Sequence, residues 1–171
     1  MPQPVFNLAD LWEQAVDHFG ERECLVANGV SRTYAEMDAR ANRLAHHLAA
    51  FVVIDWENFV IYSQNCVEWV ETLWAVFKIR AVWININYRY VEDELRYLVE
   101  NADLRAIVFA REYAPRVASV RGAMPQLVHA IYVEDGSGAP LAGTDAIEYE
   151  AALATGSPER DFAPRSEDDR Y

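Results

Sequence analysis

Three clustered glycines are the first place in this chain to look for phosphate chemistry. Sites that transfer phosphoryl or nucleotidyl groups need backbone N–H groups or cations aimed at phosphate oxygens, and glycines let the backbone approach closely. Gly136, Gly138 and Gly143 lie in an acidic stretch beside Glu134 and Asp135. Because carboxylates repel a polyphosphate, we expect no phosphate site in this loop.

Lysine and histidine side chains give no clear catalytic pattern either. Lys78 is the only lysine, and it is predicted to lie near the C-terminal end of a helix, where a cation complements the helix dipole. His46 and His47 should point about 100° apart on a helix, so they cannot jointly face one metal ion and are predicted to be exposed. His18 near a helix end and His129 at a strand edge are interpreted in the same way.

The remaining candidates are cysteines, one arginine and two acidic clusters. Cys24 and Cys66 show no CxxC spacing and no framework of paired cysteines, which favours reduced thiols in a cytoplasmic protein. Arg89 is the most tempting functional residue, but a salt bridge with Glu92, Asp93 or a neighbouring loop is preferred to a functional role. A second feature of this region is the acidic cluster Glu92–Glu94. That cluster and Glu167–Asp169 are read as solvated charges at a helix start and in a tail. We therefore expect no catalytic, cofactor-binding or metal-binding residue in this chain.

Composition narrows the class of protein. The chain has 171 residues, of which 52% are hydrophobic and 25% charged, and this is ordinary for one packed domain. A formal net charge of -12 argues against a nucleic-acid partner, because phosphate backbones are held mainly by Lys and Arg. No apolar run approaches roughly 18 residues, so no membrane span is expected.

The elements that must position these residues begin with helices. Asn7 is a good N-cap for an amphipathic helix that should end at Gly20, and Thr33 with Glu36 forms a capping box for a helix running to about Ala50. A similar Asn65-x-x-Glu68 pattern introduces a third helix that should end near Arg80. Further helical patterns are expected over 91–101, 112–121 and 146–154.

Short apolar runs predict strands. Residues 24–27 and 30–34 flank Asn28-Gly29 and predict a hairpin. The runs at 59–62, 81–86, 104–109 and 128–133 are nearly continuous and alternate with helical patterns. They predict an α/β fold with a three-layer, doubly wound, mainly parallel sheet and a short N-terminal β-hairpin. We expect residues 1–154 to form a single domain and residues 155–171 an extended or partly disordered tail.

Five segments, in order and spacing, resemble the N-terminal portion of the AMP-forming acyl-CoA synthetases, which belong to the adenylate-forming, or AMP-binding, superfamily. The likeness runs from about residue 7 to residue 169. The segments are Thr33–Met37, Asn42–Ala45, Asn65–Trp69, Asn85–Tyr90 and Glu92–Leu95.

The resemblance implies a two-step fatty-acid or carboxylate–CoA ligase that uses ATP, Mg²⁺ and coenzyme A. In that family a phosphate loop follows directly after a segment like Asp168–Tyr171. An adenine-binding motif, a ribose-binding Asp and a catalytic Lys on a C-terminal domain come later. None of these can be placed in this chain, so we expect it to bind no cofactor alone, and the remainder of the parent ligase is its missing partner.

The chain also departs from the family pattern. Residues 30–114 contain neither Gly nor Pro, residues 51–60 lack the usual Gly- and Pro-containing turn, and Arg170 stands where an apolar residue is expected. These changes lead to the hypothesis of an engineered excision that associates with itself, and a natural fragment is the rival origin. The candidate self-association surface comprises Phe51, Trp56, Phe59 and Trp83.

Three functions stay open. The first is a ligase fragment that is catalytically inactive alone, and the second is a non-catalytic scaffold that forms homo-oligomers. The third is an independent nucleotide-binding domain of Rossmann or flavodoxin type. It is disfavoured because the glycine fingerprint after the first strand is missing.

Overall fold

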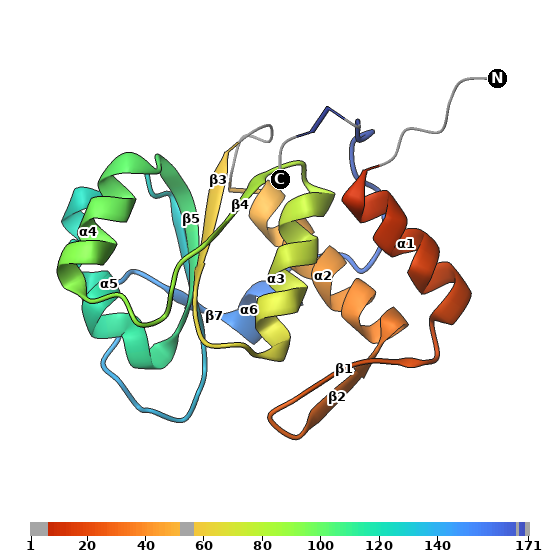
Figure 1. Cartoon of the computed structure of the whole chain (residues 1–171), viewed down its shortest axis with the longest axis horizontal. Helices are drawn as coiled ribbons and strands as arrows, with labels where there is room; N and C mark the ends of the chain where they lie inside the picture. The colour runs from red at the N-terminus through yellow and green to blue at the C-terminus, as the bar shows by residue number, and fades with distance from the viewer. Residues whose placement is uncertain (1–6, 52–56, 167, 170–171) are drawn as a thin grey trace.

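A five-stranded parallel sheet forms the centre of the molecule (Figure 1). The computed structural model describes residues 7–51, 57–166 and 168–169. The strands lie in the order β4-β3-β5-β6-β7, and every neighbouring pair is parallel. Their bounds are β3 (Asn58–Tyr62), β4 (Val82–Asn85), β5 (Leu104–Ala110), β6 (His129–Val133) and β7 (Ile147–Glu148).

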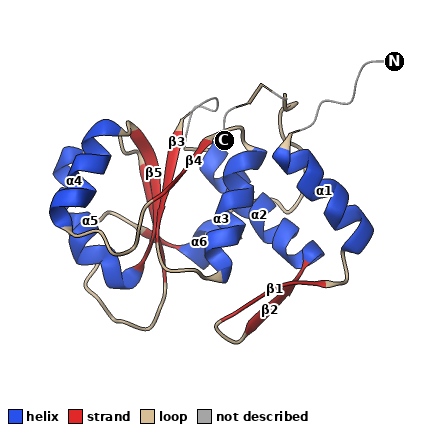
Figure 2. Ribbon diagram, in the orientation of Figure 1, coloured by secondary structure: helices blue, strands red, loops and turns tan. Residues whose placement is uncertain are grey.

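Helices cover both faces of this sheet, as Figure 2 shows. One face carries α2 (Tyr34–Ala49), α3 (Val67–Lys78) and α6 (Tyr149–Ala154). The other carries α4 (Glu92–Asn101), α5 (Ala114–Val120) and the 3-10 turns η1 (Arg111–Tyr113) and η2 (Arg121–Ala123). The first helix, α1 (Leu8–Phe19), packs against α2 and α3. The predicted α/β fold with a mainly parallel sheet between helical layers is confirmed.

A separate antiparallel hairpin joins α1 to α2. It consists of β1 (Glu23–Ala27) and β2 (Val30–Thr33). Asn28 and Gly29 at its tip have φ angles of 51° and 77°. Two consecutive positive φ angles are those of a type I′ turn, which Asn-Gly adopts most readily. The hairpin prediction is therefore confirmed at its turn and its strands.

Helix starts follow the local signals in part. The Thr33–Glu36 capping box is present, with Glu36 N–H donating to Thr33 Oγ1 and Thr33 N–H donating to the Glu36 carboxylate. By contrast, α3 begins with Cys66 as N-cap and without a side-chain cap, so the box predicted from Asn65 is wrong. The pattern at 112–121 becomes a 3-10 turn followed by a short helix, with Pro in its first turn.

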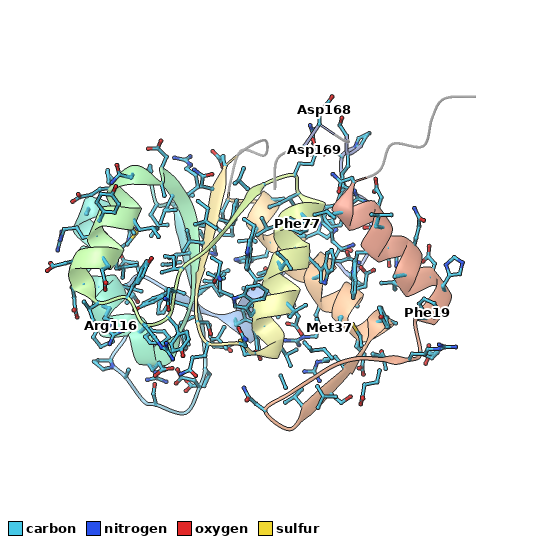
Figure 3. The ribbon with its side chains drawn as sticks, viewed as in Figure 1. Phe19, Met37, Phe77, Arg116, Asp168 and Asp169 are labelled. Atoms are coloured by element: carbon cyan, nitrogen blue, oxygen red, sulfur yellow. The ribbon has the colours of Figure 1, made fainter. Side chains whose placement is uncertain are left out.

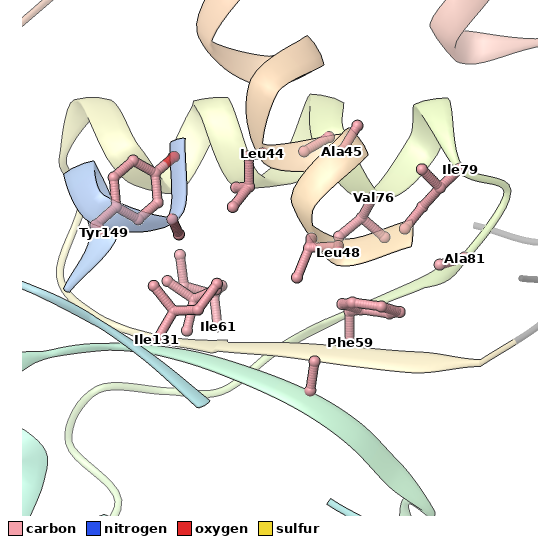
Figure 4. Close-up of a cluster of buried hydrophobic side chains, with 14 of the residues drawn as sticks. Leu44, Ala45, Leu48, Phe59, Ile61, Val76, Ile79, Ala81, Ile131 and Tyr149 are labelled. Carbon is pink, nitrogen blue, oxygen red and sulfur yellow. The ribbon is translucent and has the colours of Figure 1, made fainter. Parts of the chain in front are cut away.

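The two central strands bury alternate residues on opposite faces of the sheet. Phe59 and Ile61 of β3 pack with Leu44, Val76 and other helix residues on the α2–α3 face (Figure 4), and Val60 and Tyr62 pack on the α4–α5 face. Phe59 is 2% exposed, and this burial removes it from the predicted self-association surface. Large residues with 0–2% exposure on both faces make the sheet the core.

The described residues beyond α6 form no helix or strand, and their side chains fasten them to the helices. Arg160 Nε lies 2.7 Å from Asp38 Oδ2 on α2, and Arg165 Nη2 lies 2.6 Å from Glu13 Oε2 on α1. Asp169 accepts from Arg80 Nε at 2.8 Å and lies beside the start of α1 (Figure 3). The described residues 155–166 and 168–169 therefore belong to the packed structure.

Lys78 ends α3 in a buried cluster of charges, not at an exposed helix terminus. Its side chain is fully buried, and Nζ lies 2.5 Å from Glu13 Oε1 and 2.9 Å from Asp38 Oδ1. Asp38 also accepts from Trp12 Nε1 at 2.8 Å and from Arg160. One carboxylate thus joins α1, α2, α3 and the tail. Burial would raise the pKa of Asp38, but Lys78 and Arg160 outweigh it and hold that pKa below its usual value.

Replacing this carboxylate should destabilise the fold. We expect Asp38→Asn to lower the free energy of unfolding by roughly 3 kcal/mol at pH 7, because Lys78 then lies buried with one partner fewer. The low pKa of Asp38 means that its contribution is complete above its unfolded value of 3.8 and is lost as the pH falls further. The difference between variant and wild type should therefore shrink below that pH in urea denaturation curves.

Asp17→Asn is the matched control, because Asp17 pairs with the same Arg160 but its side chain is 65% exposed. We expect a change below about 1 kcal/mol for this control. Equal losses for the two variants would contradict the importance assigned to the buried cluster.

Candidate functional site

The strand order fixes where a ligand site would lie. The chain leaves the carboxyl end of β3 for β4 through α3 on one face, and it leaves the carboxyl end of β5 for β6 through η1 and α5 on the other. The crossovers thus diverge between β3 and β5, and in open α/β sheets ligands bind outside the carboxyl ends of strands at such a point. A pocket of about 520 Å³ lies there. Its lining includes Ser63 after β3, Ala110 at the end of β5 and Val133 at the end of β6.

Gln64 spans part of this pocket. Its Nε2 donates to Glu112 Oε1 at 3.2 Å and lies 3.5 Å from the hydroxyl of Tyr113. Ser63 Oγ donates to the Gln64 carbonyl at 2.9 Å. The turn after β3 is thus tied to the turn after β5, and the two sides of the pocket are held at a fixed separation.

The two acidic side chains that line the pocket, Glu134 and Asp135, hydrogen-bond to the loop that carries them and to the turn after β5. Glu134 accepts from Arg111 Nη1 at 2.6 Å and from the N–H of Gly136 at 3.0 Å. Asp135 accepts from the N–H groups of Glu112 and Ser137 at 2.7 and 2.8 Å. A hydrogen bond from Arg111 lowers the pKa of Glu134 below its usual value. These N–H groups are therefore engaged by carboxylates and are not directed at a ligand.

A second hollow of about 390 Å³ adjoins the first and shares Ser63 and Asn65 with it. It follows the ends of β3 and β4, and its walls combine amide and aromatic side chains. The other lining residues are Trp69, Asn85, Ile86, Asn87, Tyr88 and Tyr90.

The loop after β4 is held by α5, which lies on the same face of the sheet as α4. Arg116 of α5 donates from Nη1 to the Tyr62 hydroxyl and to the Tyr90 carbonyl, both at 3.0 Å. Tyr62 Oη also donates to that carbonyl at 2.5 Å. Arg89, the arginine singled out from the sequence, lies with its guanidinium 5.3 Å from the ring centre of Tyr88. Its backbone N–H donates to Asn87 Oδ1.

The described residues among those predicted for self-association differ in their exposure. Phe51 is 51% exposed beyond the end of α2, and Trp83 is half-buried with its ring edge against Trp69 at 5.0 Å. Phe59 belongs to the core, and Trp56 lies outside the described residues.

The polar residues that line the pocket were missed from the sequence. Ser63 and Gln64 follow the predicted strand 59–62 directly, and Glu112 follows the strand at 104–109. The carboxyl ends of parallel strands meet at one edge of a sheet, so their positions carried a signal that could have located the site. Among the described residues, no group of three or more His, Cys, Asp or Glu side chains is placed to hold a metal ion.

Comparison by sequence relates the chain to CoA ligases. A sequence model of the family described as AMP-binding enzyme matches residues 12–169. A 3-oxocholest-4-en-26-oate–CoA ligase of Rhodococcus rhodochrous is 48% identical over 165 residues, which cover 96% of this chain and 30% of that protein. A medium/long-chain-fatty-acid–CoA/3-oxocholest-4-en-26-oate–CoA ligase of Mycobacterium tuberculosis H37Rv is 41% identical with the same coverage. The chain spans about a third of these relatives.

Solved structures agree with this relation. A putative long-chain-fatty-acid CoA ligase from Rhodopseudomonas palustris matches with a TM-score of 0.83 and 27% identity, over 96% of this chain and 40% of that one. An anthranilate CoA ligase in complex with anthranoyl-AMP matches with a TM-score of 0.87 and 20% identity, over 96% and 31%. The second match, at lower identity, concerns the fold alone. Within the described part of the chain, no helix is both long and apolar enough to cross a bilayer.

Cys66 lines the pocket but is a poor nucleophile. Burial raises the pKa of its thiol to about 11, against a contact with the Ser63 hydroxyl that lowers it. At pH 8 we expect iodoacetamide to alkylate Cys66 roughly tenfold more slowly than in the urea-unfolded chain. The smaller thiolate fraction is partly offset by the greater nucleophilicity of a high-pKa thiolate.

Peptide mass spectrometry of the Cys24→Ser variant would follow Cys66 without interference from Cys24. Equal alkylation rates in the folded and unfolded chain would contradict the shielded thiol.

Proposed function

The chain belongs to the AMP-binding enzyme family, and we propose that it forms the N-terminal part of an acyl-CoA ligase. Such a ligase uses ATP and Mg²⁺ to convert a carboxylic acid to an acyl-adenylate and then transfers the acyl group to coenzyme A. The observation that carries the proposal is the 48% identity to the Rhodococcus ligase across 96% of this chain. The pocket at the carboxyl ends of β3, β5 and β6 supports it, because this is where α/β folds bind ligands.

We propose a large apolar carboxylic acid, of the steroid side-chain or fatty-acid type, as the substrate of the whole ligase. The names of the relatives from Rhodococcus and Mycobacterium support this class. The hollow beside the polar pocket also supports it, because Trp69, Ile86, Tyr88 and Tyr90 offer aromatic and aliphatic surface there.

The described lining does not fit the polyphosphate of ATP. Arg111 is the pocket's neighbouring cation, and it is already paired with Glu134 at 2.6 Å. The N–H groups of Gly136 and Ser137 donate to the carboxylates of the same loop. We therefore place phosphate and Mg²⁺ binding in parts of the ligase beyond these residues. The 171-residue chain alone is proposed to be inactive.

Self-association, a cytoplasmic location and redesign of residues 51–60 stay predictions. Of the candidate surface, exposed Phe51 and half-buried Trp83 are the described members that can still meet a second copy. Sedimentation equilibrium of the wild type and Phe51→Ser tests this alternative, because a monomeric wild type would exclude it.

The chain alone should not form adenylates. We expect no ATP–pyrophosphate exchange above background with a fatty acid or with 3-oxocholest-4-en-26-oate. We also expect no saturable heat of ATP binding in calorimetry, because Glu134 and Asp135 line the pocket and their carboxylates repel a polyphosphate. The Rhodococcus ligase, assayed in parallel, is the positive control. Saturable ATP binding to the 171-residue chain would overturn the proposal that ATP is bound by other parts of the ligase.

A chimaera tests the ligase assignment itself. Residues 7–169 of this chain would replace the corresponding segment of the Rhodococcus ligase, and acyl-CoA formation would be measured with both acid classes. We expect the chimaera to retain ligase activity, because the replaced segment contributes a wall of the site and not its phosphate groups. A matched chimaera carrying Arg116→Met should have a lower kcat/KM than the unsubstituted chimaera, because the loop that contains Tyr90 then loses its hydrogen bond to Arg116. A folded chimaera without activity would contradict the proposal.

A further inference from the structure

Two histidines far apart in the sequence meet at the amino edge of the sheet. His47 lies in the last turn of α2 and is 5% exposed, and His129 is the first residue of β6. Their Nε2 atoms are 2.7 Å apart. The prediction that both are separate surface side chains is therefore wrong. The ring of Phe51 stacks on His129 with centroids 4.3 Å apart and an interplanar angle of 5°.

Hydrogen bonds settle which nitrogen of each ring carries a proton. Thr155 Oγ1 donates its only proton to the Ala152 carbonyl at 2.8 Å. Toward His47 Nδ1, 2.6 Å away, the same oxygen must therefore accept. The proton of neutral His47 is thus on Nδ1, and its Nε2 carries a lone pair. The bond between the two Nε2 atoms must then use a proton from His129.

Both rings are neutral at physiological pH. Burial, together with the neighbouring His129, lowers the pKa of His47 to about 4. Burial lowers the pKa of His129 as well. Neutral imidazole is the form that binds metals. A ring N–H donated to a second group, as His47 donates to Thr155, is the usual arrangement behind a metal-bound histidine.

We propose that Nε2 of His47 and Nε2 of His129 together bind one divalent transition-metal ion of the Zn²⁺ or Cu²⁺ class. Binding requires His129 to move its proton from Nε2 to Nδ1 through solvent, so no net proton is released. The Nε2 atoms must also separate from 2.7 Å to about 3.3 Å, which follows from metal–nitrogen bonds of about 2.0–2.1 Å in tetrahedral geometry. Rotations of the two rings supply this movement.

The remaining positions on the metal are left to water. No third His, Cys, Asp or Glu joins the pair within the described ranges, and the half-buried His129 is the more exposed of the two rings. Imidazole ligands favour Zn²⁺ and Cu²⁺ over Mg²⁺ and Ca²⁺, which prefer oxygen. The histidine pair should therefore prefer Zn²⁺ or Cu²⁺, whereas carboxylates on the surface of the chain would bind Mg²⁺ or Ca²⁺ as well.

The pair lies at the edge of the sheet opposite the pocket. His129 begins β6, whereas Val133 at the end of the same strand lines the pocket. Metal at the pair would join the end of α2 to β6 and stabilise the fold. It would take no part in the proposed ligase reaction. The metal-site proposal can therefore be right or wrong independently of the proposed ligase function.

Calorimetric titration of the untagged, reduced chain with Zn²⁺ in excess Mg²⁺ tests the proposal. We expect one equivalent to bind and the thermal midpoint to rise, because the metal binds the folded state preferentially. His47→Gln and His129→Gln should each weaken binding by at least about tenfold. His18→Gln should leave it unchanged, because His18 is exposed on α1 and contacts its own helix.

A measurement on the wild type covers the case in which a variant fails to fold. In ¹⁵N spectra of the histidine rings, the Nε2 signals of His47 and His129 should both shift with one equivalent of Zn²⁺. The signals of His18 should stay in place. Absence of saturable binding, or ring shifts confined to His18 or His46, would overturn the proposal.

Discussion

The need to bury both faces of β3 and β5 determines most of this structure. Phe59 and Val60 point to opposite sides of the sheet, and each lies in a packed apolar cluster. A strand that is apolar on both faces requires helices on both, so α3 and α4 must cross on opposite sides. With right-handed crossovers, β4 and β5 then flank β3 on its two sides. The pocket opens between β3 and β5, where the chain leaves these two strands toward opposite sides of the sheet, and its position is a consequence of burial.

A different interaction fastens the layer outside α2 and α3. There the contacts are charged: Asp38 forms ion pairs with Lys78 and Arg160 and accepts a hydrogen bond from the indole N–H of Trp12. A buried ion pair adds less stability than its Coulomb energy suggests, because both ions lose water. Its stronger effect is on specificity, since any other packing of α1 would remove Glu13 from the buried Lys78, and any other path of the tail would remove Arg160 from Asp38. The cluster thus fixes how the outer layer is placed on the sheet.

Local signals in the sequence located the elements, and long-range contacts decided what those elements do. Asn28-Gly29 and the Thr33–Glu36 box act within a few residues, so the hairpin and the start of α2 were predictable. β7 has two residues and exists only through its pairing with β6, so no local pattern marks it. The roles of Lys78 and of the His47–His129 pair were misjudged because Asp38 lies 40 residues from Lys78 in the sequence and His129 lies 82 residues from His47.

The candidate site shows the same division. Its edge follows from the strand pattern, but its chemical character depends on which polar groups are already engaged. In the sequence, Glu134 and Asp135 were expected only to repel a polyphosphate, and in the structure they also accept hydrogen bonds from the N–H groups of their own loop. Such a lining gives the pocket a defined shape and a fixed polar surface, but it offers a ligand few free hydrogen-bond donors.

Shape is in turn controlled from outside the pocket. Arg116 of α5 lines neither hollow, but it donates hydrogen bonds to the Tyr62 hydroxyl and the Tyr90 carbonyl. These two bonds fix the position of the loop after β4 relative to β3. A change in the packing of α5 would move that loop without altering any lining residue. Because catalytic geometry tolerates errors well below 1 Å only, the helix layer behind the sheet is part of what defines this wall. On this reasoning the N-terminal part of the proposed ligase contributes precision of position, and the groups that contact phosphate come from the rest of the enzyme.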